Sequence, residues 1–110
     1  MAADPVTGNT IRWTFSDGVM AGKTFEHTFG TDGGVTFREI GKDGKPGKAN
    51  KYEVVEAGHE VYAVAYLSES GYTLTTILDF QTKKLVAFAS NEKNLSKHHG
   101  TFQPLGKMPV

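Results

Sequence analysis

Short apolar-rich runs alternate along the chain with clusters of Gly, Asp, Asn and Pro, and inside the runs apolar and polar residues alternate with a period of two. This period sends successive side chains to opposite faces of a strand, whereas a helix needs apolar residues three or four positions apart. No run has the length and periodicity of an amphipathic helix. The pattern predicts strands over residues 11–17, 22–29, 33–40, 50–56, 59–67, 71–80, 84–90 and about 99–103.

Turn-forming residues such as Asp32-Gly33-Gly34 and Ser70-Gly71 separate these runs, so the connections are short and neighbouring strands are antiparallel. An open sheet of this size would leave two edges unpaired, and closure removes them. The sequence therefore predicts an all-β fold, a single antiparallel up-and-down β-barrel of about eight strands. Residues 1–110 form one domain, with residues 1–9 as a flexible tail and residues 41–49 as a mobile loop.

The interior of such a barrel holds side chains or one small ligand. Alternation places Trp13 and Phe15 on one face of their strand, and does the same for Phe25, His27 and Phe29. His27 is then either an ordinary core histidine with a satisfied hydrogen bond or a polar group of a binding site. The residues expected to line a ligand site are Trp13, Phe15, Phe25, His27, Phe29, Tyr62 and Tyr66.

Residues 59–67 and 84–90 are apolar on both faces, because Val61, Ala63, Ala65 and Leu67 alternate with Tyr62, Val64 and Tyr66. A strand of this kind is either covered on both sides within one fold or packed against another protomer. We therefore expect a homodimer through strands 59–67 and 84–90, with coverage inside the fold as the alternative.

The charge balance excludes several partners, since 12 Lys and Arg offset 12 Asp and Glu. A nucleic-acid or membrane-surface protein needs a cationic excess. No apolar run approaches the ~20 residues of a membrane span, and the start of the chain lacks a basic stretch followed by an apolar one. We therefore expect a cytoplasmic protein that binds neither nucleic acid nor membranes.

Cofactor and metal sites have little support in the sequence. Without Cys there is no thiolate nucleophile and no Cys-ligated metal. The adjacent His98 and His99 would point to opposite faces of a strand, and we expect them in a solvated loop before the last strand. Nucleotide-binding glycine patterns and the Gly-x-Ser-x-Gly motif are missing. We expect no metal and no cofactor.

Two residues could support acid–base chemistry. Arg38, in a predicted strand, could bind a carboxylate with its guanidinium fork, although alternation favours an outward side chain. Glu69 follows an apolar strand, where a shielded carboxyl group could exchange protons near neutrality; a solvated turn carboxylate is the alternative.

The stretches WTFSDG (13–18), VTFREIG (35–41) and YLSESGYTLTTILDFQTKKLVAFASN (66–91) resemble the MoaF-like domains, which are small lipocalin-like barrels. The same order of features, over roughly residues 11–103, is similar to the dimeric phenolic acid decarboxylases. That similarity implies a cofactor-free reaction in which Arg38 and Glu69 act on an aromatic acid. The paired tyrosines of those enzymes would fall on Trp13 and Phe15, which have no phenolic hydroxyl.

Three functions follow from these observations. The first is a binding module for a small apolar or aromatic compound, which could bear a carboxylate. The second is a cofactor-free lyase or isomerase acting on aromatic acids through Arg38 and Glu69. The third is a non-catalytic interaction domain with a filled interior.

Overall fold

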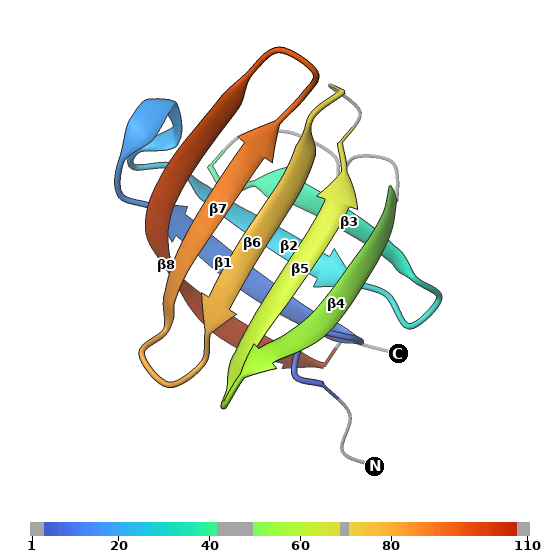
Figure 1. Ribbon diagram of the computed structural model, residues 1–110. Helices are drawn as coiled ribbons and strands as arrows, with labels where there is room; N and C mark the ends of the chain where they lie inside the picture. The colour runs from blue at the N-terminus through green and yellow to red at the C-terminus, as the bar shows by residue number, and fades with distance from the viewer. Residues whose placement is uncertain (1–3, 42–49, 69–70, 108–110) are drawn as a thin grey trace.

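The period-two segments of the sequence fold as strands, and each strand pairs with its neighbours in chain order (Figure 1). The computed structural model describes residues 4–41, 50–68 and 71–107. Within them β8 pairs with β1 and closes the barrel, which confirms the predicted all-β, up-and-down, lipocalin-like fold. The elements are β1 (Asn9–Phe15), the 3-10 turn η1 (Gly18–Met20), β2 (Thr24–Phe29), β3 (Gly34–Glu39), β4 (Asn50–Gly58), β5 (Val61–Leu67), β6 (Thr73–Asp79), β7 (Lys84–Ser90) and β8 (Leu95–Lys107).

The barrel is flattened into two layers. Strands β4 to β8 lie side by side in one layer, and β1, β2 and β3 cross behind them (Figure 1). Most neighbouring strands pair over much of their length, with seven residue pairs between β5 and β6. Between β3 and β4 the described residues form two pairs, Gly34 with Lys51 and Val35 with Asn50. Among the described residues, this seam is therefore the least paired part of the ring.

The last strand is much longer than the predicted range of about 99–103. Strand β8 begins at Leu95 because its first half pairs with β7, and it continues to Lys107 because its second half pairs with β1. Gly100 belongs to both ladders, and a Cβ there would lie 2.2 Å from the carbonyl oxygen of Thr14. Pairing with two partners, and not apolar alternation, sets the length of this strand.

The N-terminal segment is also more ordered than the expected tail over residues 1–9. The Asp4 carboxylate accepts the backbone N–H groups of Val6 at 2.9 Å and Thr7 at 2.6 Å, which fixes a turn. Val6 is fully buried, and β1 already starts at Asn9. Residues 4–9 therefore pack on the barrel, whereas residues 1–3, and residues 42–49 of the predicted 41–49 loop, lie outside the described residues.

The packed core occupies one half of the barrel, at the end where β1 begins and β2 ends. There Phe29 meets Tyr52 edge-on, with 5.1 Å between ring centroids, and Phe80 meets Phe102 in the same way at 4.9 Å. Inward-facing side chains from both layers fill this half, and they are Val6, Ile11, Phe29, Val35, Tyr52, Val64, Leu78, Leu85 and Phe102. The other half of the interior is hollow.

Candidate ligand-binding site

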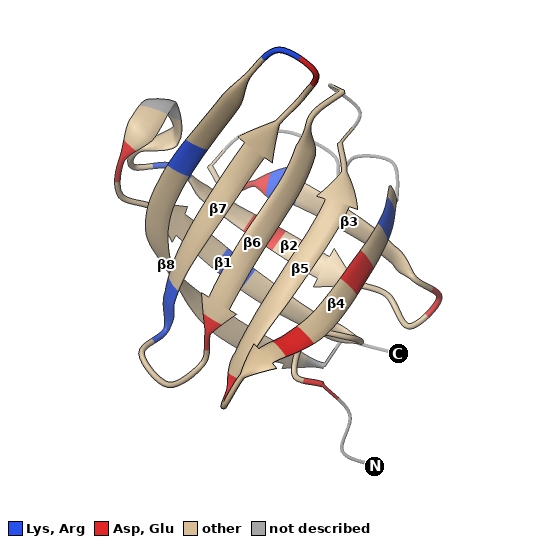
Figure 2. Cartoon of the chain, viewed as in Figure 1, with Lys and Arg blue, Asp and Glu red and all other residues tan. Residues whose placement is uncertain are grey.

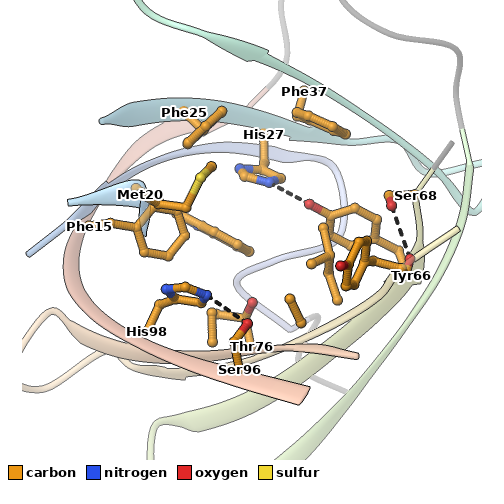
Figure 3. A pocket seen from close by; sticks show the side chains of 15 residues that line it. Phe15, Met20, Phe25, His27, Phe37, Tyr66, Ser68, Thr76, Ser96 and His98 are labelled. Atoms are coloured by element: carbon orange, nitrogen blue, oxygen red, sulfur yellow. Dashed lines mark hydrogen bonds between the residues drawn. The ribbon is translucent and has the colours of Figure 1, made fainter. Parts of the chain in front are cut away.

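A cavity of about 420 Å³ fills the hollow half, at the end where β1 ends and β8 begins (Figure 3). It lies inside the range of about 300–1,000 Å³ that small-molecule pockets commonly have. Its wall is mainly aromatic and aliphatic and comes from both layers of the barrel. The lining residues are Trp13, Phe15, Met20, Phe25, His27, Phe37, Tyr66, Ser68, Tyr72, Leu74, Thr76, Ala87, Ala89, Ser96 and His98.

A stack of rings forms one side of this wall. The rings of Trp13 and His27 lie 3.8 Å apart and nearly parallel, and His27 also stacks on Phe37 at 5.5 Å. Phe15 and Phe25 meet edge-on at 5.9 Å. The strand period accounts for this arrangement, because Trp13 and Phe15 on β1, like Phe25 and His27 on β2, are two positions apart and point inward.

His27 forms the polar centre of the stack. Its Nε2 lies 2.8 Å from the Tyr66 hydroxyl, and its Nδ1 has no hydrogen-bond partner among the described residues. Burial lowers the pKa of His27 to about 3 and raises the pKa of Tyr66 above its usual value. His27 is therefore a neutral imidazole near pH 7. Its hydrogen bond to Tyr66 is typical of a core histidine, and its place on the cavity wall is that of a polar group in a binding site.

The prediction that His98 lies in a solvated loop was wrong, because β8 already includes it. His98 is buried, its Nε2 lies 3.0 Å from Ser96 Oγ, and its ring meets Phe15 edge-on. His27 and His98 approach the cavity from opposite sides (Figure 3). A Cβ on Gly18 would come within 2.3 Å of His98 Nδ1, so the η1 turn packs directly on this imidazole.

His99 points outward, as expected for the neighbour of His98 in a strand, and it anchors the segment that carries Met20. Asp17 accepts the His99 backbone N–H and also contacts its ring Nδ1, both at 2.7 Å. The contacts with His99 hold the pKa of Asp17 below its usual value. These contacts tie the end of β1 and η1 to β8, and so fix Met20 at the cavity.

Arg38 lies on the outside of the barrel and does not line the cavity, where the resemblance to the decarboxylases would place it. Phe37 takes the inward position, so the next residue on β3 must point outward. Arg38 contacts Glu26 at 3.3 Å, and Arg12 contacts the same carboxylate at 3.0 Å. The two guanidinium groups, Arg12 foremost, hold the pKa of Glu26 below its usual value. The lining residues given above include no Asp, Glu, Lys or Arg.

The remaining predicted site residues divide into two groups. Trp13, Phe15, Phe25, His27 and Tyr66 line the cavity, as the alternation suggested. Phe29 and Tyr62 do not, because they belong to the packed half, where Phe29 lies against Tyr52 and Tyr62 lies edge-on to Phe80 at 5.8 Å. The position of a residue along its strand decides whether it lines the cavity or joins the packed half. Alternation predicts only whether its side chain points inward. Glu69 lies outside the described residues.

Several residues that line the cavity were not predicted as site residues from the sequence. Phe37 could have been found, since the alternation that sends Arg38 outward sends Phe37 inward. Leu74 and Thr76 share one face of β6, and Tyr72 precedes the strand in the same alternation, so all three carried the same signal. Met20 had no usable signal because it lies in the turn η1, and Ser96 lies in the first half of β8, which was not predicted as a strand.

Neither a metal centre nor a membrane helix is present in the part of the chain that the structure describes. Across residues 4–41, 50–68 and 71–107, no three His, Asp or Glu side chains group as metal ligands would. In the same ranges no helix has the length and apolar character that a membrane crossing requires.

Comparisons with known proteins agree with the fold. Residues 1–94 match the family model described as the MoaF N-terminal domain. A solved structure from Burkholderia vietnamiensis, described as a "putative beta-lactamase", superposes with a TM-score of 0.75 at 17% identity, covering 96% of this chain and 100% of that chain. That likeness shows a shared fold. No match was found among curated proteins. Because the family model spans residues 1–94 of 110, the chain belongs to the MoaF N-terminal domain family.

Proposed function

We propose that this barrel binds one small, uncharged and largely apolar molecule in its hollow half. The observation that carries the proposal is the cavity of about 420 Å³, whose described lining residues are mostly aromatic or aliphatic and carry no charged side chain. Apolar walls with a few polar groups that fix orientation are typical of small-molecule sites. Here His27 Nδ1, Thr76 Oγ1 and His98 Nδ1 are polar atoms of lining residues that have no hydrogen-bond partner among the described residues, so they are candidates for fixing the orientation of the ligand.

The wall favours a neutral ligand over the carboxylate-bearing ligand that the sequence left open. An ionised carboxylate loses its hydration on entering an apolar cavity, and it needs a cationic partner there. Arg38 and Arg12 instead pair with Glu26 on the outside, and His27 is neutral near pH 7 because burial lowers its pKa to about 3. A carbonyl or hydroxyl group on an aromatic or aliphatic body fits this wall better.

The lyase hypothesis depended on Arg38 holding a substrate carboxylate inside the barrel. With Arg38 outside and paired with Glu26, that part of the mechanism has no support. The binding function therefore accounts for more of the observed geometry than the catalytic one.

Fluorescence titration with N-phenyl-1-naphthylamine, a neutral apolar dye, tests the proposal. Trp13 is the sole tryptophan and lines the cavity, so energy transfer from it reports dye bound nearby. We expect saturable dye emission at one molecule per chain. Ala87→Phe, which fills the cavity from β7, should weaken binding at least about tenfold, a loss of about 1.4 kcal/mol. Ala57→Phe, at an exposed position outside the cavity lining, is the matched control and should not change the affinity.

A matched pair of competitors tests the charge preference. 4-tert-Butylacetophenone and 4-tert-butylbenzoate have similar shapes, but only the second is an anion at pH 7. The ketone should displace the dye, and the benzoate should do so about a hundredfold less well because its charge must be desolvated. Absence of dye binding, or equal loss in Ala87→Phe and Ala57→Phe, would contradict the binding site. Equal displacement by the two competitors would contradict the preference for a neutral ligand.

A further inference from the structure

We propose that the outer surface of β5, β6 and β7 is a homodimer interface, in which two chains face each other across a two-fold axis parallel to these strands. The proposal is independent of ligand binding, because it concerns side chains that point away from the cavity. It extends the expectation from residues 59–67 and 84–90 by placing β6 at the centre and by fixing the orientation of the second copy.

The surface consists of three cross-strand rows without a charged side chain on the middle strands. One row runs from Val55 through Ala63 and Ile77 to Val86. The next contains Ala65, Thr75 and Phe88, and the third Leu67, Thr73 and Ser90. Large apolar side chains at its border are unusually exposed, with Val55 at 63%, Leu67 at 62% and Leu95 at 76%. A contiguous exposed apolar surface of this kind is typical of a protein contact.

The opposite wall of the barrel shows what a solvated surface looks like in this chain. On β1, β2 and β3 the outward positions carry the Arg12–Glu26–Arg38 ion pairs and the hydrogen-bonded pairs Thr10–Thr28 and Thr14–Thr24. Figure 2 shows the difference, since β5, β6 and β7 are uncharged over most of their length. The outward positions of β5, β6 and β7 are therefore less polar than those of β1, β2 and β3.

The charges at the two borders of the apolar surface select a second copy as its partner. The central row continues in register to Glu53 on β4 at one end and to Lys97 on β8 at the other. Figure 2 shows acidic bands along β4, after a basic band at its start, and a basic band on β8, on either side of the uncharged strands. Glu53 has only an exposed contact with Lys51 at 3.5 Å, and Lys97 has no ion pair among the described residues.

With a two-fold axis along β6, the acidic border of each copy faces the basic border of the other. Because β6 is the middle strand between β4 and β8, the rotation places Glu53 of each copy opposite Lys97 of the other and places apolar rows on apolar rows. Such an interface is isologous, so every contact occurs twice. Each of β5, β6 and β7 is paired on both sides, so association through these strands uses their outer face and not a free edge.

Sedimentation equilibrium of the full chain tests whether the surface is used. We expect a dimer, with twice the 11.9 kDa chain mass, that dissociates on dilution. Ile77→Lys, at the centre of the surface, should raise the dissociation constant at least about a hundredfold, since it places two like charges in an apolar contact. Thr36→Lys, on the outward face of β3, is the control and should not change it. Circular dichroism confirms that each variant is folded.

A charge exchange tests the orientation. Glu53→Lys alone would oppose two lysines at each end of the interface, and Lys97→Glu alone would oppose two glutamates, so each should weaken the dimer about tenfold. The double variant restores opposite charges and should return the dissociation constant to within about threefold of the original. Both positions are exposed in the single chain, so these substitutions should not unfold it.

Each result bears on one part of the proposal. A monomer at all concentrations overturns it, as does a dimer that Ile77→Lys leaves intact. Single charge variants without effect, or a double variant no stronger than either single one, overturn the two-fold arrangement. Dye binding measured on the same samples stays a separate readout, because the cavity lies on the other face of these strands.

Discussion

His27 and Tyr66, 39 positions apart in the sequence, meet inside the barrel with 2.8 Å between Nε2 and the phenolic oxygen. This contact joins β2 of one layer to β5 of the other at the boundary between the packed half and the cavity. Both side chains are buried, so their polar atoms depend on each other for hydrogen bonding. The pair therefore links the stability of the barrel to the shape of its cavity.

The burial of His27 predicts a pH dependence of stability. Its pKa falls from 6.5 to about 3 on folding, so the unfolded chain binds more protons between these values. The free energy of unfolding should therefore fall as the pH drops from 6.5 towards 3, with a contribution from this group of about 1.4 kcal/mol per pH unit. Above pH 6.5 the contribution is constant.

Urea denaturation at several pH values measures this slope. His27→Phe should remove the contribution of this residue, so the stability of the variant should decline less steeply on acidification than that of the original chain. His59→Phe, at an exposed turn position, serves as the control and should retain the full slope. Identical slopes for the original chain and His27→Phe would show that His27 is not buried as a neutral group.

Removing the Tyr66 hydroxyl should leave His27 Nε2 without its partner. Tyr66→Phe is expected to destabilise the barrel by about 1–3 kcal/mol, the usual cost of an unpaired buried polar group. Tyr62→Phe gives the comparison, because the Tyr62 ring packs on Phe80 and its hydroxyl forms no hydrogen bond within the described residues. That change should stay within about 0.5 kcal/mol. Similar losses in the two variants would argue against the His27–Tyr66 bond.

The close approach of Gly18 to His98 predicts a coupled pair of substitutions. Gly18 has a φ of 76°, and a Cβ there would lie 2.3 Å from His98 Nδ1, so Gly18→Ala adds both backbone strain and a clash. We expect a loss of about 2–4 kcal/mol. In a His98→Ala background the clash disappears, and Gly18→Ala should cost only about 1 kcal/mol. Additive effects in a double-mutant cycle would show that η1 does not pack on this imidazole.

Arg38 should be dispensable for ligand binding. Arg38→Met removes one of two guanidinium groups on Glu26 at the outer surface, and such exposed pairs contribute up to about 1 kcal/mol to stability. Dye affinity and the preference for the ketone over the benzoate should both be unchanged. A large loss of dye affinity in a folded Arg38→Met variant would show that Arg38 takes part in ligand binding.

The sequence was sufficient for the fold because alternation and turn chemistry are local signals. Trp13, Phe15, Phe25 and His27 were placed inside by the same alternation that forms their strands. Alternation also favoured an outward Arg38, and the resemblance to the decarboxylases was what placed it in a catalytic role. Where family likeness and strand period disagreed, the period was correct for this residue.

What the sequence could not supply was the position of each residue along the barrel axis. Phe29 and Tyr62 point inward like Phe25 and Tyr66, yet they lie in the packed half because strand register sets their height. The buried position of His98 depends on β8 pairing with β7 from Leu95 onward, in a hairpin that turns at Asn91–Asn94. That turn is a local signal, but the residues after it do not alternate between apolar and polar, so the first half of β8 was not predicted as a strand.

The most direct test of the central claim is the set of intermolecular nuclear Overhauser effects between bound N-phenyl-1-naphthylamine and isotope-labelled protein. Binding in the hollow half predicts contacts from the dye to Phe25 on β2, Leu74 on β6 and Ala87 on β7, which line the cavity from both layers of the barrel. Contacts restricted to outward side chains such as Val55 and Leu67, with none to these three, would contradict an internal binding site.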